Sequence, residues 1–370
     1  MMEQAKFSIN YKRIAVAILI IAGIFVAAWL IFDSIFPRMV LQGENLVLSA
    51  GARQTFEHDN MALLVGNDGL TLVNRRSEVV WSANERFSAP FVSVNGEFIL
   101  YGSRRGQNAV VFRNRREVYR VETAENITLG RVNRNGYAAV VTTAEREVGV
   151  NGIVVIFDRA GDEIFRWRAG AADNNYIINV DIAPNGREIA IAKLVSDGAA
   201  VASTVTIVDI ARSEVIEVIR RENSLIGAIS YNRSGDLLAV SDTELLGLHR
   251  DGRIRFEVPF NGRRLLTFNT DSENAVVLGF YAGRDNVTVE IYSRDGRLRG
   301  TYHSQGQIRN LTVSGDVILA SRFRTVVRIM PNGRAEQILE IPYDIHSLQV
   351  MGDGRHALII GGANANVIRF

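Results

Sequence analysis

The sequence predicts an all-β fold: a β-propeller, with eight four-stranded blades favoured over seven, preceded by one transmembrane helix. Three observations support this prediction. A hairpin phrase recurs along the chain, the segment from Leu46 onward alternates apolar and polar residues in short runs without a long helical period, and an uncharged apolar run stands near the start. Because these are patterns of residue type, they predict shape and location and leave the chemistry open.

The first forty residues indicate a membrane location. The run IAVAILIIAGIFVAAWLIF, residues 14–32, carries no charge and as a helix would span about 29 Å, close to the thickness of a bilayer core. Lys6, Lys12 and Arg13 precede it, so the positive-inside bias predicts a cytoplasmic tail over 1–13, a transmembrane helix over 14–36 and a linker over 37–44. The remainder is expected outside the cytoplasm, on the periplasmic side of the inner membrane. A cleaved signal peptide is the alternative, because VAA at 26–28 resembles a cleavage site.

The repeat defines the predicted ring. Phrases such as FDRAGDEIFRW from Phe157 and LHRDGRIRFEV from Leu248 each contain a strand end, a tight turn and a second strand. The apolar residues before these turns recur every 37 to 51 positions, at Val73, Phe112, Phe157, Val208, Leu248, Tyr292 and Ile329. Four short strands in each unit of this length are typical of a propeller blade, so the phrase is predicted to join the third and fourth strands of each blade.

The two ends of the repeat region predict how the ring closes. Residues 345–370 supply three strands and lack a fourth, whereas NLVLSA at 45–50 precedes a complete unit and is one strand too many. We therefore expect a propeller over 45–370 in which the strand at 45–50 completes the last blade. Such closure would pair edges that otherwise stay exposed.

Two phrase endings carry a family resemblance. SEVVW at 77–81 and DEIFRW at 162–167 look like the PQQ-type repeat, and residues 45–370 resemble the WD40-like and PQQ-like (quinoprotein-type) propeller superfamily. The Trp-Asp and Gly-His signatures of WD40 blades are absent, and only Trp81 and Trp167 stand at the tryptophan position. A tethered propeller of this plan also resembles membrane-anchored bacterial proteins of unassigned function. The resemblance implies an architecture and no activity, because no residues match the calcium site, catalytic aspartate and tryptophan platform of a quinoprotein enzyme.

Catalytic and metal-binding patterns are missing from the sequence. There is no cysteine, which excludes disulfides, thiolate zinc sites and iron–sulfur clusters. The five histidines are dispersed, without the spacing of a metal site, and no nucleophile elbow or phosphate-binding loop occurs. Three of the 42 basic and one of the 40 acidic residues precede Ile14, so the rest of the chain is neutral overall. We expect no enzyme activity, no cofactor, no metal and no nucleic acid.

One local feature stands out as a candidate binding site. Between residues 104 and 134, arginines outnumber glutamates by five charges. The eight arginines are Arg104, Arg105, Arg113, Arg115, Arg116, Arg120, Arg131 and Arg134. Because second and third blades are neighbours in a propeller, they could form one basic sector facing an anionic partner, such as lipid headgroups, acidic cell-wall polymer or an acidic protein surface. The alternative is an ordinary solvated edge.

These observations favour an interaction scaffold. A single membrane helix would hold a rigid ring in the cell envelope, where its loops or edges bind another envelope protein. A sensor that binds a small molecule or glycan in the central channel is the alternative, and a PQQ-type enzyme ranks third.

Overall fold

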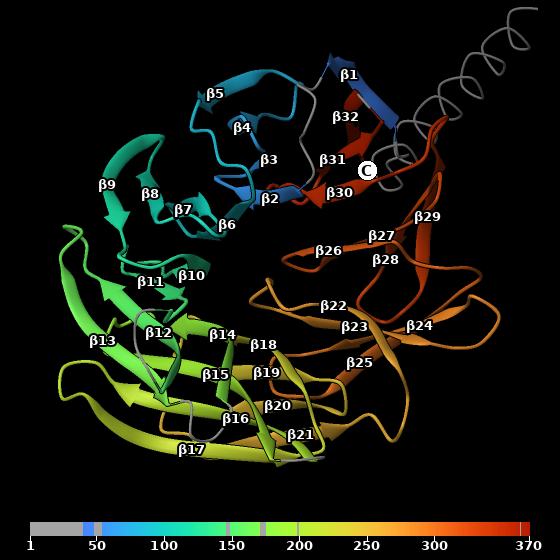
Figure 1. Cartoon of the computed structure of the whole chain (residues 1–370). Coiled ribbons are helices and arrows are strands. Elements are labelled where there is room, and N and C mark those ends of the chain that lie inside the picture. The colour runs from blue at the N-terminus through green and yellow to red at the C-terminus, as the bar shows by residue number, and fades with distance from the viewer. Residues whose placement is uncertain (1–39, 48–53, 146–148, 171–174, 198–199, 363) are drawn as a thin grey trace, which may run out of the picture.

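The protein forms a closed ring of eight antiparallel, four-stranded sheets (Figure 1). The computed structural model describes residues 40–47, 54–145, 149–170, 175–197, 200–362 and 364–370. All helix or strand structure in these ranges is β-strand. The predicted all-β propeller with eight blades is therefore confirmed, and seven blades are excluded.

Within each blade the first strand lies nearest the axis and the fourth lies on the rim (Figure 1). Blades 1 and 2 are β2 (Gln54–His58), β3 (Met61–Gly66), β4 (Gly69–Val73), β5 (Val79–Ala83) and β6 (Pro90–Asn95), β7 (Phe98–Ser103), β8 (Asn108–Arg113), β9 (Arg116–Glu122). Blades 3 and 4 are β10 (Ile127–Val132), β11 (Ala138–Thr142), β12 (Val150–Phe157), β13 (Glu163–Gly170) and β14 (Asn175–Ile182), β15 (Glu188–Asp197), β16 (Ala200–Asp209), β17 (Glu214–Glu222).

The second half of the chain repeats the same order. Blades 5 and 6 are β18 (Ile226–Tyr231), β19 (Leu237–Ser241), β20 (Glu244–Leu248), β21 (Ile254–Pro259) and β22 (Leu265–Asn269), β23 (Val276–Tyr281), β24 (Val287–Tyr292), β25 (Leu298–Ser304). Blades 7 and 8 are β26 (Asn310–Ser314), β27 (Val317–Arg322), β28 (Thr325–Ile329), β29 (Ala335–Glu340) and β30 (Ser347–Val350), β31 (His356–Gly361), β32 (Asn364–Arg369), β1 (Val40–Val47).

An amino-terminal strand completes the last blade. β1 pairs antiparallel with β32, with Val40 opposite Arg369 and Leu46 opposite Ala365. The strand was predicted at 45–50 after a linker over 37–44, but it begins at Val40, so residues 40–44 belong to the ring; residues 48–50 lie outside the described residues. An irregularity between Gln42 and Leu46 breaks the alternation of the ladder, which is why the sequence pattern places the strand too late.

The repeated phrase forms the hairpin between the third and fourth strands. In all seven units the ladder shifts register at the apolar anchor residue, from Val73 in blade 1 to Ile329 in blade 7. In four hairpins the turn ends on a glycine in the left-handed region, which Gly adopts without steric cost: Gly161, Gly252, Gly296 and Gly333. Each of these glycines lies directly against the fourth strand of the preceding blade. The phrase therefore recurs because each turn packs on a neighbouring blade as well as reversing the chain.

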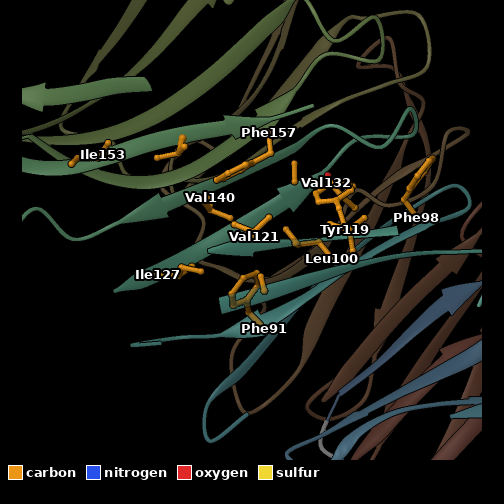
Figure 2. Packing of buried hydrophobic residues seen from close by; sticks show 14 residues of the cluster. Phe91, Phe98, Leu100, Tyr119, Val121, Ile127, Val132, Val140, Ile153 and Phe157 are labelled. Atoms are coloured by element: carbon orange, nitrogen blue, oxygen red, sulfur yellow. The ribbon is translucent and has the colours of Figure 1, made fainter. Parts of the chain in front are cut away.

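The core lies between the blades. Buried hydrophobic residues in the described ranges form eight clusters, one for each pair of neighbouring blades. Figure 2 shows the cluster between blades 2 and 3, where Phe91 and Leu100 meet Val140 and Ile153. Ala138 and Val140 of β11 face blade 2, whereas the alternating residues Ala139 and Val141 face blade 4. The second and third strands are thus buried on both sides and read as continuous apolar runs.

The ring has two faces that differ in their loops. We call upper the face formed by the loops between second and third strands and between successive blades. We call lower the face formed by the turns between first and second and between third and fourth strands. Because Val40 pairs with Arg369, at the lower end of β32, the chain before residue 40 joins the ring at its lower face.

The predicted tail and transmembrane helix, residues 1–13 and 14–36, lie outside the described residues. From Val40 onward, the described part of the chain contains no helix long and apolar enough to cross a bilayer.

Candidate functional site

The eight arginines predicted as one basic sector occupy different parts of blades 2 and 3. Arg104 and Arg105 lie in the upper turn between β7 and β8. Arg113, Arg115 and Arg116 surround the lower turn between β8 and β9, and Arg134 lies in the lower turn between β10 and β11. Arg120 is on the rim strand β9, and Arg131 is on β10 beside the axis. The fold brings four of them to the lower face and does not gather all eight on one surface.

Several of these arginines also have acidic partners. Arg113 Nε lies 3.0 Å from Glu97, Arg115 Nη2 lies 3.0 Å from Asp59, and Arg120 Nη2 lies 2.6 Å from Glu85. Exposed pairs of this kind contribute less than about 1 kcal/mol each, but they reduce the local charge surplus. Binding of an anionic partner by this sector stays a prediction.

Exposed apolar side chains mark the upper face instead. Six large hydrophobic residues at its loops and strand ends are between 41% and 53% exposed: Tyr176, Val201, Leu225, Leu266, Tyr281 and Phe323. Phe268, on the inner strand β22, is also exposed. In the described residues, no lower-face turn carries such a side chain, but the lower ends of three rim strands do: Val79, Ile254 and Leu298 are between 49% and 54% exposed. The other exposed hydrophobics are spread around the rim, with at least one on the fourth strand of each of blades 1 to 7.

Phe323 is the most unusual member of this group. It lies in the two-residue turn between β27 and β28 with φ of 40°, in the left-handed region that bulky residues avoid. The guanidinium carbon of Arg309 lies 3.9 Å from the centre of the Phe323 ring, a cation–π contact between neighbouring loops. The sequence contained one signal for this position, because Phe-Arg stands where such turns usually have Asn-Gly.

The upper face also holds a small cavity at the junction of blades 1 and 2. Its volume is about 280 Å³, and its lining residues are Gln54, Val65, Asn67, Ser88, Ala89, Pro90 and Arg104. Arg104 is the one member of the predicted basic sector that reaches it, and its Nη1 donates a hydrogen bond to the carbonyl of Thr128 at 2.9 Å. The volume lies just below the usual range for small-molecule sites.

Near the lower end of the axis, the buried carboxylate of Asp181 joins two blades. Its Oδ1 accepts a hydrogen bond from the backbone N–H of Ile182 at 3.1 Å, and its Oδ2 accepts one from Tyr231 of blade 5 at 2.6 Å. Burial raises the pKa of Asp181 to about 6, although the two N–H donors and the nearby Arg131 oppose this increase. Two other neighbouring inner strands are joined in a similar way. The Ser93 hydroxyl accepts a hydrogen bond from the backbone N–H of Val132, and the Thr312 hydroxyl accepts one from the backbone N–H of Val350.

Asp181 should therefore make the stability of the ring depend on pH. A carboxyl group with a pKa near 3.8 in the unfolded chain and about 6 in the fold retains its proton only in the folded state between these values. Stability then falls as the pH rises through this window, by about 3 kcal/mol from this group. Urea unfolding at pH 4 and pH 7 measures most of this change: because the unfolded carboxyl is already partly ionised at pH 4, the free energy of unfolding of wild type relative to Asp181→Asn should fall by about 2.5 kcal/mol between these two pH values. A difference that does not change with pH contradicts the assignment.

In the described residues, no three His, Asp or Glu side chains converge on a point where they could hold a metal ion. That the protein is not an enzyme stays a prediction.

Comparison with known proteins places the chain in a family. A family model described as a family of unknown function (DUF5711) matches residues 45–370. The chain belongs to this family. The DUF5711 match begins within β1 and covers all the other strands, so the family region and the ring nearly coincide. No curated protein matches the sequence.

Among solved structures, the DUF5711 chain is similar to the C-terminal WD40 domain of Sif2. The two share 12% sequence identity with a TM-score of 0.43, and the match covers 76% of this chain and 96% of that domain. The propeller assignment here rests on the eight sheets of the chain itself. The resemblance to PQQ-like propellers and to membrane-anchored bacterial proteins, which the sequence suggested, stays a prediction.

Proposed function

We propose that this DUF5711 protein is a membrane-anchored scaffold of the cell envelope whose upper face docks another envelope protein. The predicted transmembrane helix at 14–36 acts as the anchor, with the tail over 1–13 in the cytoplasm and the ring outside it. Because β1 begins at Val40, only residues 37–39 separate the predicted helix from the ring. The chain enters the ring at the lower face, where β1 begins. The lower face then lies toward the membrane and the upper face toward soluble partners.

One observation carries the proposal: the exposed hydrophobic side chains outside the rim gather on the upper face. Exposed apolar surface is unfavourable in water and commonly marks an interaction site when it is concentrated. Tyr281 and Phe323 are aromatic residues, which are enriched in protein interfaces because they bury a large area with little loss of conformational freedom. A rigid ring that presents such groups on loops suits docking.

Binding of a small molecule or glycan ranks second. The cavity beside Arg104 supports it, as does the exposed Phe268 near the axis. However, the polar groups that line this cavity, Gln54, Asn67, Ser88 and Arg104, are exposed and are not held in a fixed orientation by burial. Docking of a protein explains more of the exposed surface.

Site-specific photo-crosslinking in intact cells tests the docking function. A photoreactive residue at Leu225 or Tyr281, on the upper face, should give the same crosslinked protein, because both positions would be covered by one partner. The matched lower-face positions, Arg212 and Arg334, should not give it. The product should remain with the membrane fraction after an alkaline wash, as expected for an anchored scaffold. Equal crosslinking from both faces, or none from the upper face, contradicts the proposal.

A further inference from the structure

We propose that part of the upper face, over blades 6 and 7, recognises an acidic segment of the partner protein. This inference rests on the docking function proposed above and specifies the chemistry of the partner. The surface consists of two exposed aromatic residues and four exposed arginines, and we call it the basic aromatic patch. Its residues are Arg264, Tyr281, Arg284, Arg309, Phe323 and Arg324.

The loops that carry the patch form one continuous surface. Gln307, in the loop after β25, donates a hydrogen bond to Asp285 in the turn after β23 at 2.9 Å. From the same loop, Arg309 stacks on Phe323, and Arg322 Nη1 donates to the carbonyl of Gln305 at 2.8 Å. At the start of the patch, the N–H of Tyr281 donates to the carbonyl of Arg264. These contacts hold the aromatic and basic groups in a fixed arrangement before any partner binds, which reduces the entropy lost on binding.

The conformation of Phe323 indicates a role outside folding. A left-handed backbone destabilises a bulky residue such as phenylalanine, and a glycine or asparagine would form this turn with less strain. The Phe323 side chain is 51% exposed, so its burial within the ring offers little compensation. The cation–π contact with Arg309 is weakly stabilising at an exposed site and does not offset this strain. A strained, exposed aromatic residue with a cation stacked on it is better explained by a binding partner than by stability.

The charges of the patch select the sign of that partner. Arg324 is paired with Asp344, its Nε lying 2.8 Å from Oδ1. The only other carboxylate in these described loops, Asp285, accepts a hydrogen bond from Gln307. Arg264, Arg284 and Arg309 have no carboxylate within ion-pair distance among the described residues. Three exposed cations beside two aromatic rings fit a segment in which glutamate or aspartate alternates with apolar residues.

Fluorescence anisotropy tests the proposed chemistry directly. The full chain in a neutral detergent is titrated against a short fluorescein-labelled peptide of alternating glutamate and leucine, and against the matched peptide with lysine in place of glutamate. We expect binding of the acidic peptide only, weakening as salt increases. Arg309→Ala and Phe323→Gly should each weaken binding by about threefold or more. Phe323→Gly suits the test because glycine accepts the left-handed backbone and keeps the ring folded.

Two arginines of the lower face provide matched controls. Arg76→Ala and Arg212→Ala remove the same charge from exposed turns and should leave peptide binding unchanged. Binding of the lysine peptide, or equal loss from lower-face variants, overturns the proposal. Failure of this inference is separable from failure of the docking function. If the upper face crosslinks a partner and Arg309→Ala leaves that product intact, docking stands and the acidic segment is wrong.

Discussion

Removal of residues 1–47 should lower the melting temperature of the ring by about 10 °C or more. This truncation deletes β1, which forms the fourth strand of the last blade by pairing with β32. Without it, the N–H and C=O groups of β32 that face β1 become an open sheet edge, and the first and last blades are no longer joined through the chain. An unprotected edge strand is also a template for association, so the truncated protein should self-associate.

A second truncation isolates the role of the strand. Removal of residues 1–39 keeps β1 complete and should leave the melting temperature of the ring close to that of the full chain. Differential scanning calorimetry and light scattering on the two truncated proteins measure stability and association. Equal melting temperatures for the chains that begin at residues 40 and 48 would show that β1 does not hold the ring together.

Gly333→Ala should reduce the free energy of unfolding by about 3 to 5 kcal/mol. Gly333 ends the hairpin between β28 and β29 with φ of 85°, a conformation that costs alanine about 1 to 2 kcal/mol. A Cβ at this position would also overlap the backbone of Thr301 in the fourth strand of blade 6. Because the overlapped atoms are backbone, no side-chain rotation relieves the clash, and blades 6 and 7 must separate.

The chain offers a control for the backbone conformation alone. Gly283 has φ of 83°, and a Cβ there would meet no atom within 4 Å. Gly283→Ala should therefore reduce stability only by the left-handed cost of about 1 to 2 kcal/mol. Denaturant unfolding measures the loss of unfolding free energy in each variant. The larger loss in Gly333→Ala, after the loss in Gly283→Ala is subtracted, is due to the close approach of blades 6 and 7. If both glycines cost the same, packing of the turn against the preceding blade contributes nothing.

The strand order and the blade boundaries were accessible from the sequence because they depend on local patterns. Turn residues such as those at 158–162 and the apolar anchors at Phe157 and Leu248 recur with each blade, and every anchor coincides with a register shift. The exact start of the closing strand was not accessible. The irregularity between Gln42 and Leu46 hides the alternation there, and only pairing with β32 defines the strand.

The candidate site was much less predictable. Counting charges along the chain grouped Arg104 with Arg113 and Arg134, but successive turns of a blade alternate between the upper and lower faces, so neighbours in sequence are separated in space. Conversely, Arg309 and Phe323 lie fourteen positions apart in different loops and stack on each other. Sequence proximity is a poor guide to surface patches in this fold because each strand crosses the full thickness of the ring.

By itself, the sequence determined that this chain forms eight β-blades and that an apolar run precedes them, because hydrophobic period, turn chemistry and segment length are local properties. Only the tertiary structure decided which loops share a face, which arginines are paired, and that the chain joins the ring from below while the exposed aromatic residues lie above. Those features depend on contacts between segments distant along the chain, which residue patterns do not encode.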